Sequence, residues 1–313
     1  MARSARATFI AQLEAHTHAV QGNHLLKASP PDQTMDEAAR LARNGLAVVG
    51  FAVLEDFVRH RCRELVAHMS LGPAAFAELP DALRSAVSEG VVSTLLAQVR
   101  QLRRSDEDPL ELIQDTGRAL ASTKTGALEI SPLALLWDGS NLNSSDLQAI
   151  LKALGVKDAW RKMSALCQSA GFAVLDARAA FDELARNRHR SAHLADHDAT
   201  VLSIRSLPRV ALAVGFAFDA LASKAAHHCH LASHDYLLEG YDLVADDVPL
   251  RFLDDRGTDW AEVRQGRKRA YRIHATRGVG RAEAIKRCID AGETLVVRDR
   301  SGHPTDWIPG DLP

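Results

Sequence analysis

Residues 35–69 have the spacing of apolar side chains that an amphipathic helix requires. Apolar residues recur there every three or four positions, as Leu46, Val49, Val53, Phe57 and Leu65. Polar residues such as Glu55 and Arg59 stand between them, and Gly72-Pro73 follows as a helix-ending signal. The pattern predicts one long helix over this stretch.

The same periodicity predicts further helices over the first two-thirds of the chain. The expected helices span residues 81–104, 147–154, a segment that begins near 158, 175–189 and 199–226. Pro80 stands at the start of the first, Ser144-Ser145-Asp146 looks like a cap for the second, and Pro208 is expected to break or kink the last. Residues 105–145 are interrupted by prolines and glycines, so we expect short helices and loops inserted there.

The balance of charge changes after His230. Residues 232–262 contain nine Asp or Glu against two Arg, which favours a linker or a poorly packed flank. Residues 264–300 contain eleven Lys or Arg against four Asp or Glu. In this basic part, strand-like segments at 270–276 and 293–298 flank a helix-like segment, which predicts a small α+β domain.

The sequence thus predicts a mainly α fold with three parts. They are a helical domain over residues 1–231, an acidic linker or flank over 232–262, and a small basic α+β domain over 263–313. The net charge of −2 argues against a generally basic nucleic-acid coat protein.

Cysteine usage and hydropathy indicate the compartment. The four cysteines are scattered without a Cys-x-x-Cys pair, which fits reduced thiols better than a disulfide framework. No apolar run approaches the ~20 residues of a membrane span, and the N-terminus lacks the apolar core of a signal peptide. We expect a soluble cytoplasmic protein with no membrane partner.

The run from Leu184 to Leu194 carries the residues best suited to chemistry. Arg188 and His193 are five positions apart in it, and His189 directly follows the arginine. A guanidinium can bind a phosphate through two parallel hydrogen bonds, and an imidazole exchanges a proton near neutral pH. These groups are the minimal equipment for cleaving a phosphodiester without a metal.

The spacing also sets a geometric condition. On a regular helix, Arg188 and His193 point about 140° apart, whereas His189 and His193 share a face. For the arginine and the last histidine to converge, the helix must loosen or end between them. Ser191 and the polar segment 196–198 are compatible with such an ending, so we expect the helix to stop short of His193.

This run and the helices around it resemble the HEPN superfamily. HEPN nucleases carry an Arg, a polar residue, three further residues and a His, and the pattern here is Arg188-His189-Arg190-Ser191-Ala192-His193. The resemblance covers about residues 35–230 and implies a HEPN-like helical bundle. One feature departs from the family: Asn is the commonest residue after the Arg, whereas here Asn187 precedes it.

The resemblance implies a metal-independent endoribonuclease that needs no cofactor. A histidine would take the proton of a ribose 2′-OH, and the alkoxide would attack the adjacent phosphorus to leave a 2′,3′-cyclic phosphate and a 5′-OH. In this superfamily two protomers bring their motifs together, which implies a homodimer with a composite active site. Such proteins are toxins or anti-phage defence effectors, which implies an antitoxin or defence-system partner protein.

Roles follow for single residues. We expect Arg188 to bind and stabilise the scissile phosphate, His193 to act as general acid and base, and His189 to assist or orient. Supporting or substrate-binding roles are expected for Asn187, Arg190, Ser191 and Glu55. Glu55 would orient Arg188 through an ion pair; the alternative is that Glu55 and Asp56 are simply exposed charges on an amphipathic helix.

Three other interpretations compete with this one. The arginines around Arg188 can be a solvated helix end that complements the helix dipole, with the histidines as surface residues. The fold can also be an inactive HEPN-like dimerisation or interaction module that partners an ATPase, nuclease or nucleotidyltransferase. A metal-dependent hydrolase is disfavoured, because no set of carboxylates and histidines has ligand spacing.

Three further features lie outside the motif. The cluster His227-His228-Cys229-His230, with His234 nearby, lacks the spacing of zinc sites, so we expect a frayed helix end rather than a metal site. Gly278-Val279-Gly280 can hold an anion at a helix N-terminus, but is more often only a turn. The basic residues with Tyr271 among them, Arg264, Arg267, Lys268, Arg269, Arg272 and Arg277, can bind an RNA backbone or dock on the acidic flank, and both readings stay open.

Overall fold

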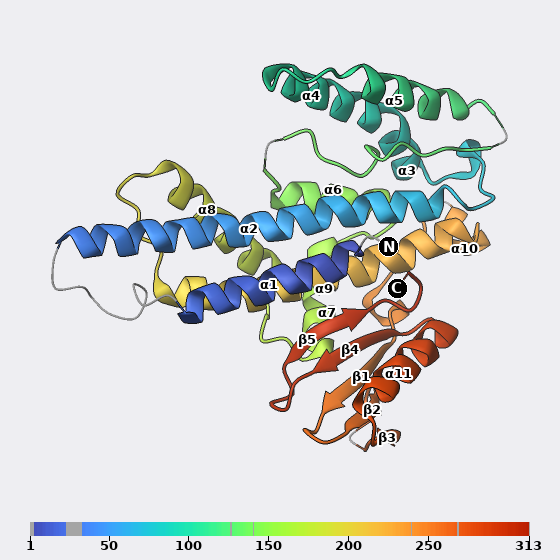
Figure 1. Ribbon diagram of the computed structural model, residues 1–313. Coiled ribbons are helices and arrows are strands. Elements are labelled where there is room, and N and C mark those ends of the chain that lie inside the picture. The colour runs from blue at the N-terminus through green and yellow to red at the C-terminus, as the bar shows by residue number, and fades with distance from the viewer. Residues whose placement is uncertain are drawn as a thin grey trace.

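Two long helices form the frame of the protein, α2 (Gln33–Met69) and α9 (Val201–His230), and they pack along each other (Figure 1). This computed structural model describes residues 3–22, 33–125, 127–139, 141–238, 240–267 and 269–312. The helix expected at 35–69 is confirmed as α2. Helix α9 is continuous through Pro208, so the break expected there does not occur.

The other helices surround this pair. They are α1 (Ala5–Gly22), α3 (Asp81–Ser85), α4 (Val91–Arg104), α5 (Leu110–Ser122), α6 (Ser144–Ala153), α7 (Ala159–Ala170), α8 (Ala177–His193) and α10 (His234–Leu237). A π-helical turn at Ala86–Gly90 joins α3 to α4, and short 3-10 turns lie at Phe76–Glu78 and Ala245–Asp247. The cap of α6 is Asn143 rather than Ser144-Ser145-Asp146, because the Asn143 side chain accepts the N–H groups of Ser145 and Asp146.

Glycines let α1 approach the frame closely. A Cβ at Gly215 of α9 would lie 2.9 Å from the ring of Phe9 in α1, and one at Gly50 of α2 would lie 2.9 Å from the ring of His16 in α1. Helix α9 is long and apolar enough to span a membrane, but 61% of its most apolar 18-residue stretch is buried inside the protein. Small side chains along α9 therefore serve helix packing in this bundle.

A five-stranded mixed sheet and one helix form the C-terminal part. The strands are β1 (Leu250–Asp255), β2 (Trp260–Arg264), β3 (Arg272–His274), β4 (Thr294–Arg298) and β5 (Pro304–Ile308), and the helix is α11 (Arg277–Ala291). Their order is β3-β2-β1-β4-β5, with only the β1–β4 pair parallel. A mainly helical protein with a small C-terminal α+β part, 62% helix in all, confirms the expected fold class.

The expected acidic linker over 232–262 is wrong for its second half. Strands β1 and β2 lie there, and β1 is the central strand of the sheet. The acidic residues are compensated by basic residues that are distant in sequence: Asp254 forms a two-point ion pair with Arg298 at 2.6 and 2.9 Å. Charge counted along the chain could not reveal this pairing across strands.

A tryptophan of the sheet packs deep into the bundle. Trp307 of β5 is buried against Phe9, Phe57 and Phe216, with ring centroids 5.9–6.2 Å from its own. Its indole N–H donates to Asp219 of α9 at 2.7 Å. One side of the sheet therefore shares the hydrophobic core of the helices, while a second, smaller apolar cluster lies between the sheet and α11.

Asp219 is also half of a buried ion pair. It is 0% exposed, and Nε of Arg61, which is 2% exposed, donates to it at 2.6 Å. The same guanidinium donates to Ser223 at 2.9 Å and to the backbone oxygen of Leu312 at 2.7 Å. One arginine of α2 thus bonds to α9 and to the chain beyond β5.

We expect Asp219→Ala to lower the free energy of unfolding by about 3–5 kcal/mol, because it leaves the buried guanidinium of Arg61 with only the part-exposed Glu64 as its charge partner and leaves the indole N–H of Trp307 without its acceptor. Urea denaturation measures the change. The matched control is Asp115→Ala, which breaks an exposed pair with Arg118 and should cost less than about 1 kcal/mol. Equal effects of the two substitutions would contradict the central place of Asp219.

Three histidines meet where α2 and α9 end. The ring of His68 stacks on that of His230 at 4.2 Å and lies 5.8 Å from that of His227. Helix α9 stays intact through these residues, so the frayed end expected at 227–230 is wrong. Within the described ranges, no three His, Cys, Asp or Glu side chains are grouped so as to hold a metal ion.

This cluster predicts a loss of stability in mild acid. Burial, together with the charges of His230, His227 and Arg61, lowers the pKa of His68 to about 4, against about 6.5 in an unfolded chain. Between these values the unfolded chain binds a proton that the folded protein does not, so stability falls as pH drops from about 6.5 to about 4. We expect His68→Phe to make the melting temperature depend less on pH in this window. Identical profiles for His68→Phe and wild type would refute this.

Candidate active site at the end of α8

The Arg/His motif lies on the last turns of α8. The helix begins at an Asp176 cap, whose carboxylate accepts the N–H of Ala179 at 3.0 Å. It continues through His193, and the N–H of Leu194 still donates to the oxygen of Arg190 at 2.9 Å. The expectation that the helix stops short of His193 is therefore wrong, because neither glycine nor proline interrupts its hydrogen bonds.

A continuous helix places the motif residues on two faces. Phe181 and Leu184 are buried, and Arg188 and Ser191 continue their stripe toward the interior. His189 and His193 lie one turn apart on the exposed side, with ring centroids 4.8 Å apart. Arg188 and His193 of one chain thus point in different directions.

The charge of Arg188 acts on Glu55 of α2, but among the described residues no ion pair within 4.0 Å joins the two, so the expected ion pair is not formed. Burial raises the pKa of Glu55. Two effects oppose that rise: the N–H of Leu142 donates to the carboxylate at 2.6 Å, and the positive charges of Arg188 and Arg59 lie near it. Glu55 is therefore half-buried and engaged, not a free surface charge. Asp56 instead lies near the exposed His60, at 3.2 Å.

Two polar atoms of the motif are buried without a hydrogen-bond partner in the described part of the chain. They are Nε of Arg188 and Oγ of Ser191, which lie one helical turn apart on the same face. Buried polar groups are nearly always bonded, because an unmet donor costs about 1–3 kcal/mol. The two atoms therefore have unused hydrogen-bonding capacity on the face of α8 that carries Arg188.

The other expected supporting residues have different surroundings. Asn187 donates to Ser203 at 3.3 Å and contacts the His197 ring nitrogen at 3.1 Å, so it ties α8 to the start of α9. Arg190 is exposed. Asn187 thus contributes to positioning, and its side chain is already bonded.

The loop after the motif is held by α2. Asn44, which is buried, donates to the oxygen of His197 at 2.7 Å and accepts the N–H of Ala199 at 3.0 Å. Arg43 forms a two-point ion pair with Asp198 at 2.6 and 2.8 Å. Sequence analysis missed these contacts. Asn44 does not belong to the predicted apolar stripe of this helix, so the apolar spacing gave no signal for it.

Comparison with known proteins adds no relative. No family model matches the chain, and neither a curated protein nor a solved structure is significantly similar to it. The geometry of the residues therefore carries the argument for function.

The free energy of unfolding tests whether Nε of Arg188 lacks a hydrogen bond in the folded protein. Arg188→Met keeps the aliphatic stem and removes the unbonded nitrogen, so we expect the free energy of unfolding to stay within about 1 kcal/mol of wild type. Arg61→Met is the control, and removing that fully bonded guanidinium should cost about 3–5 kcal/mol. If both variants lose the same stability in urea denaturation, Arg188 has a structural role.

Proposed function

We propose that this protein is a metal-independent endoribonuclease of the HEPN type. The observation that carries the proposal is the pair of buried atoms without hydrogen bonds on Arg188 and Ser191. The exposed rings of His189 and His193 lie on another face of the same helix. A guanidinium with free hydrogen-bonding capacity suits a phosphate, and exposed imidazoles suit proton transfer.

The continuous helix requires a composite site. Since Arg188 and His193 of one chain point apart, the phosphate held by Arg188 would meet His193 of the partner subunit. Exposed apolar side chains near this end of the bundle support a second copy there: Leu41, Val49, Leu194 and Leu202. A two-fold dimer would form two such sites.

The reaction is an internal transesterification. An imidazole accepts the proton of the ribose 2′-OH, the oxygen attacks the adjacent phosphorus, and the bond to the 5′-oxygen breaks. A second imidazole protonates that leaving oxygen, while Arg188 stabilises the charge on the phosphoryl oxygens. The products are a 2′,3′-cyclic phosphate and a 5′-OH. A role as toxin or defence effector, with a partner protein that restrains or triggers it, rests on the resemblance alone.

One observation favours a second candidate, an inactive interaction module. The same separation of Arg188 from His193 would leave the motif without function in a monomer, and the exposed leucines would then serve only binding. The two candidates differ in one result: only the enzyme cleaves RNA.

We expect the purified protein to cleave RNA in EDTA and to leave cyclic phosphate ends. Arg188→Ala and His193→Ala should each lower the rate by about 10²–10⁴-fold, since each removes a charge-stabilising or proton-transferring group. End-group analysis of the fragments measures the chemistry.

The matched control is Arg186→Ala, which removes an exposed arginine of the same helix that pairs with Glu183 at 2.8 Å. It should cleave at the wild-type rate. Cleavage that stops with EDTA and returns with magnesium would contradict the mechanism, and so would full activity of both motif variants.

A further inference from the structure

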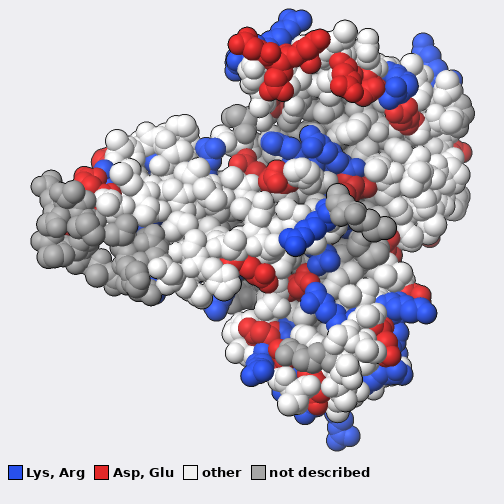
Figure 2. Space-filling view, in the orientation of Figure 1, with Lys and Arg blue, Asp and Glu red and all other residues white. Residues whose placement is uncertain are grey.

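The hairpin between β2 and β3 carries a basic hollow that the candidate active site does not use. Strand β2 ends at Arg264 and β3 begins at Arg272, and the chain turns through Gly266, whose φ of +73° suits glycine. Arg264, Arg267, Arg269 and Tyr271 line a hollow of about 400 Å³. No acidic side chain is among the residues that line it. Figure 2 shows Lys and Arg side chains projecting from the lower end of the molecule, where Figure 1 places β2 and β3.

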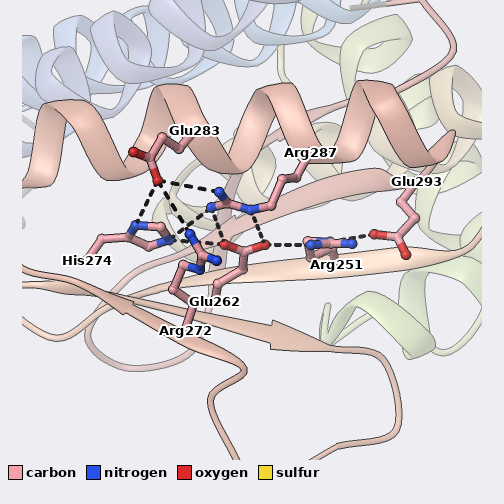
Figure 3. A network of polar contacts seen from close by, with 7 residues as sticks. All are labelled: Arg251, Glu262, Arg272, His274, Glu283, Arg287 and Glu293. Carbon is pink, nitrogen blue, oxygen red and sulfur yellow. Dashed lines mark hydrogen bonds and ion pairs between the residues drawn. The ribbon is translucent and has the colours of Figure 1, made fainter.

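The acidic residues nearby are already engaged with other arginines (Figure 3). Glu262 of β2 is fully buried, and Arg251 and Arg287 each donate to it at 2.6 Å. Burial alone would raise the pKa of Glu262, but bonds from Arg287, Arg251 and His274 lower it to about 2. It therefore stays ionised and committed to this network at neutral pH.

The hairpin arginines take no part in that network. Among the described residues, no ion pair to a carboxylate includes Arg264, Arg267 or Arg269, whereas Arg272 lies 3.9 Å from Glu283. The sequence left two interpretations open for these arginines, and one was an ion-pair contact with the acidic segment 232–262. Other arginines make that contact: Arg287 pairs with Glu262, and Arg298 pairs with Asp254. Lys268 lies outside the described residues, as does the side chain of Arg277.

An aromatic ring completes the hollow. Tyr271 is 50% exposed, and the guanidinium carbon of Arg264 lies 4.4 Å from its ring centroid. Its backbone N–H donates to the oxygen of Glu262 at 2.7 Å, which fixes the residue beside β2. A half-exposed aromatic ring that already stacks with a guanidinium can also stack with an unpaired base.

We propose that this hairpin binds single-stranded RNA, with phosphates at Arg264, Arg267 and Arg269 and a base stacked on Tyr271. Unpaired arginines supply the attraction to the backbone, and an aromatic ring selects strands whose bases are free to stack. The inference rests on the proposed function in so far as RNA is the substrate of that activity. The hairpin and α8 lie at different ends of the molecule (Figure 1), so the hairpin would anchor the strand away from the cleavage site.

Binding can be measured apart from cleavage. A labelled 2′-O-methyl RNA of about 20 nucleotides has no free 2′-OH to attack, so fluorescence anisotropy reports its affinity alone. Three phosphate contacts on a single strand give a log–log salt slope of about 2, or a loss of about 16-fold in affinity between 50 and 200 mM salt. The triple substitution of Arg264, Arg267 and Arg269 by Gln should weaken binding and remove that slope.

The ring is tested by a conservative pair. Tyr271→Ala should weaken binding by about tenfold, and Tyr271→Phe should bind like wild type, because stacking needs the ring and not the hydroxyl. The control for net charge is a triple substitution by Gln of three exposed, paired arginines elsewhere, Arg84, Arg118 and Arg161. That control should keep wild-type affinity.

Two results would overturn the proposal. One is equal loss of affinity in the hairpin variant and the charge control. The other is equally tight binding, through the same hairpin residues, of duplex DNA or of vesicles that contain phosphatidylserine. His193→Ala separates this inference from the proposed function, because it removes a proton-transferring group and no phosphate contact: it should lower cleavage by about 10²–10⁴-fold and leave anisotropy unchanged. RNA binding by the wild type without any cleavage would refute only the enzyme.

Discussion

The buried ion pair between Arg61 of α2 and Asp219 of α9 is the contact on which the rest of the structure depends. Two charges removed from water are tolerated only when nearly all their hydrogen-bonding capacity is met. Here Asp219 accepts bonds from Arg61, Ser223 and Trp307, and the arginine also bonds to Leu312. The pair therefore fixes the two frame helices and the C-terminal sheet against one another at one point.

Helix α2 extends this fixed geometry to the candidate site. From Arg61 toward its N-terminal end, it presents first Glu55, beside Arg188, and then Asn44, which holds the loop after α8. The position of the motif is thus set by a rigid helix rather than by its own loop. In the proposed enzyme this would keep the phosphate-binding arginine in place, with its guanidinium under-bonded until a substrate arrives.

Local patterns explain what could be predicted from the sequence. The apolar period of Leu46 to Leu65 identified α2, because this signal acts within a few turns of the chain. The buried Asp219, the cross-strand pair of Asp254 with Arg298, and the Trp307 contact with the bundle join residues far apart in sequence. No local count could reveal them, which is why an acidic segment was mistaken for a linker.

The candidate site shows the same division. The sequence identified Arg188, its neighbour Glu55 and the exposed histidines, since residue types and helical spacing are local properties. It failed on the end of α8, because the convergence required of Arg188 and His193 suggested an ending that no glycine or proline in the helix supplies. In the proposed enzyme, this correction leaves the partner's His193 to act on the phosphate at Arg188, in line with the composite site that the resemblance implies.

The most direct test of this account is complementation between two inactive variants. Arg188→Ala and His193→Ala subunits, mixed in equal amounts and allowed to exchange, form about half mixed dimers, each with one site that has both wild-type residues. The account predicts that RNA cleavage in EDTA returns to about a quarter of the wild-type rate, because one site in four is then intact. A mixture as inactive as either variant alone, beside an active wild type, would contradict a site shared between two chains.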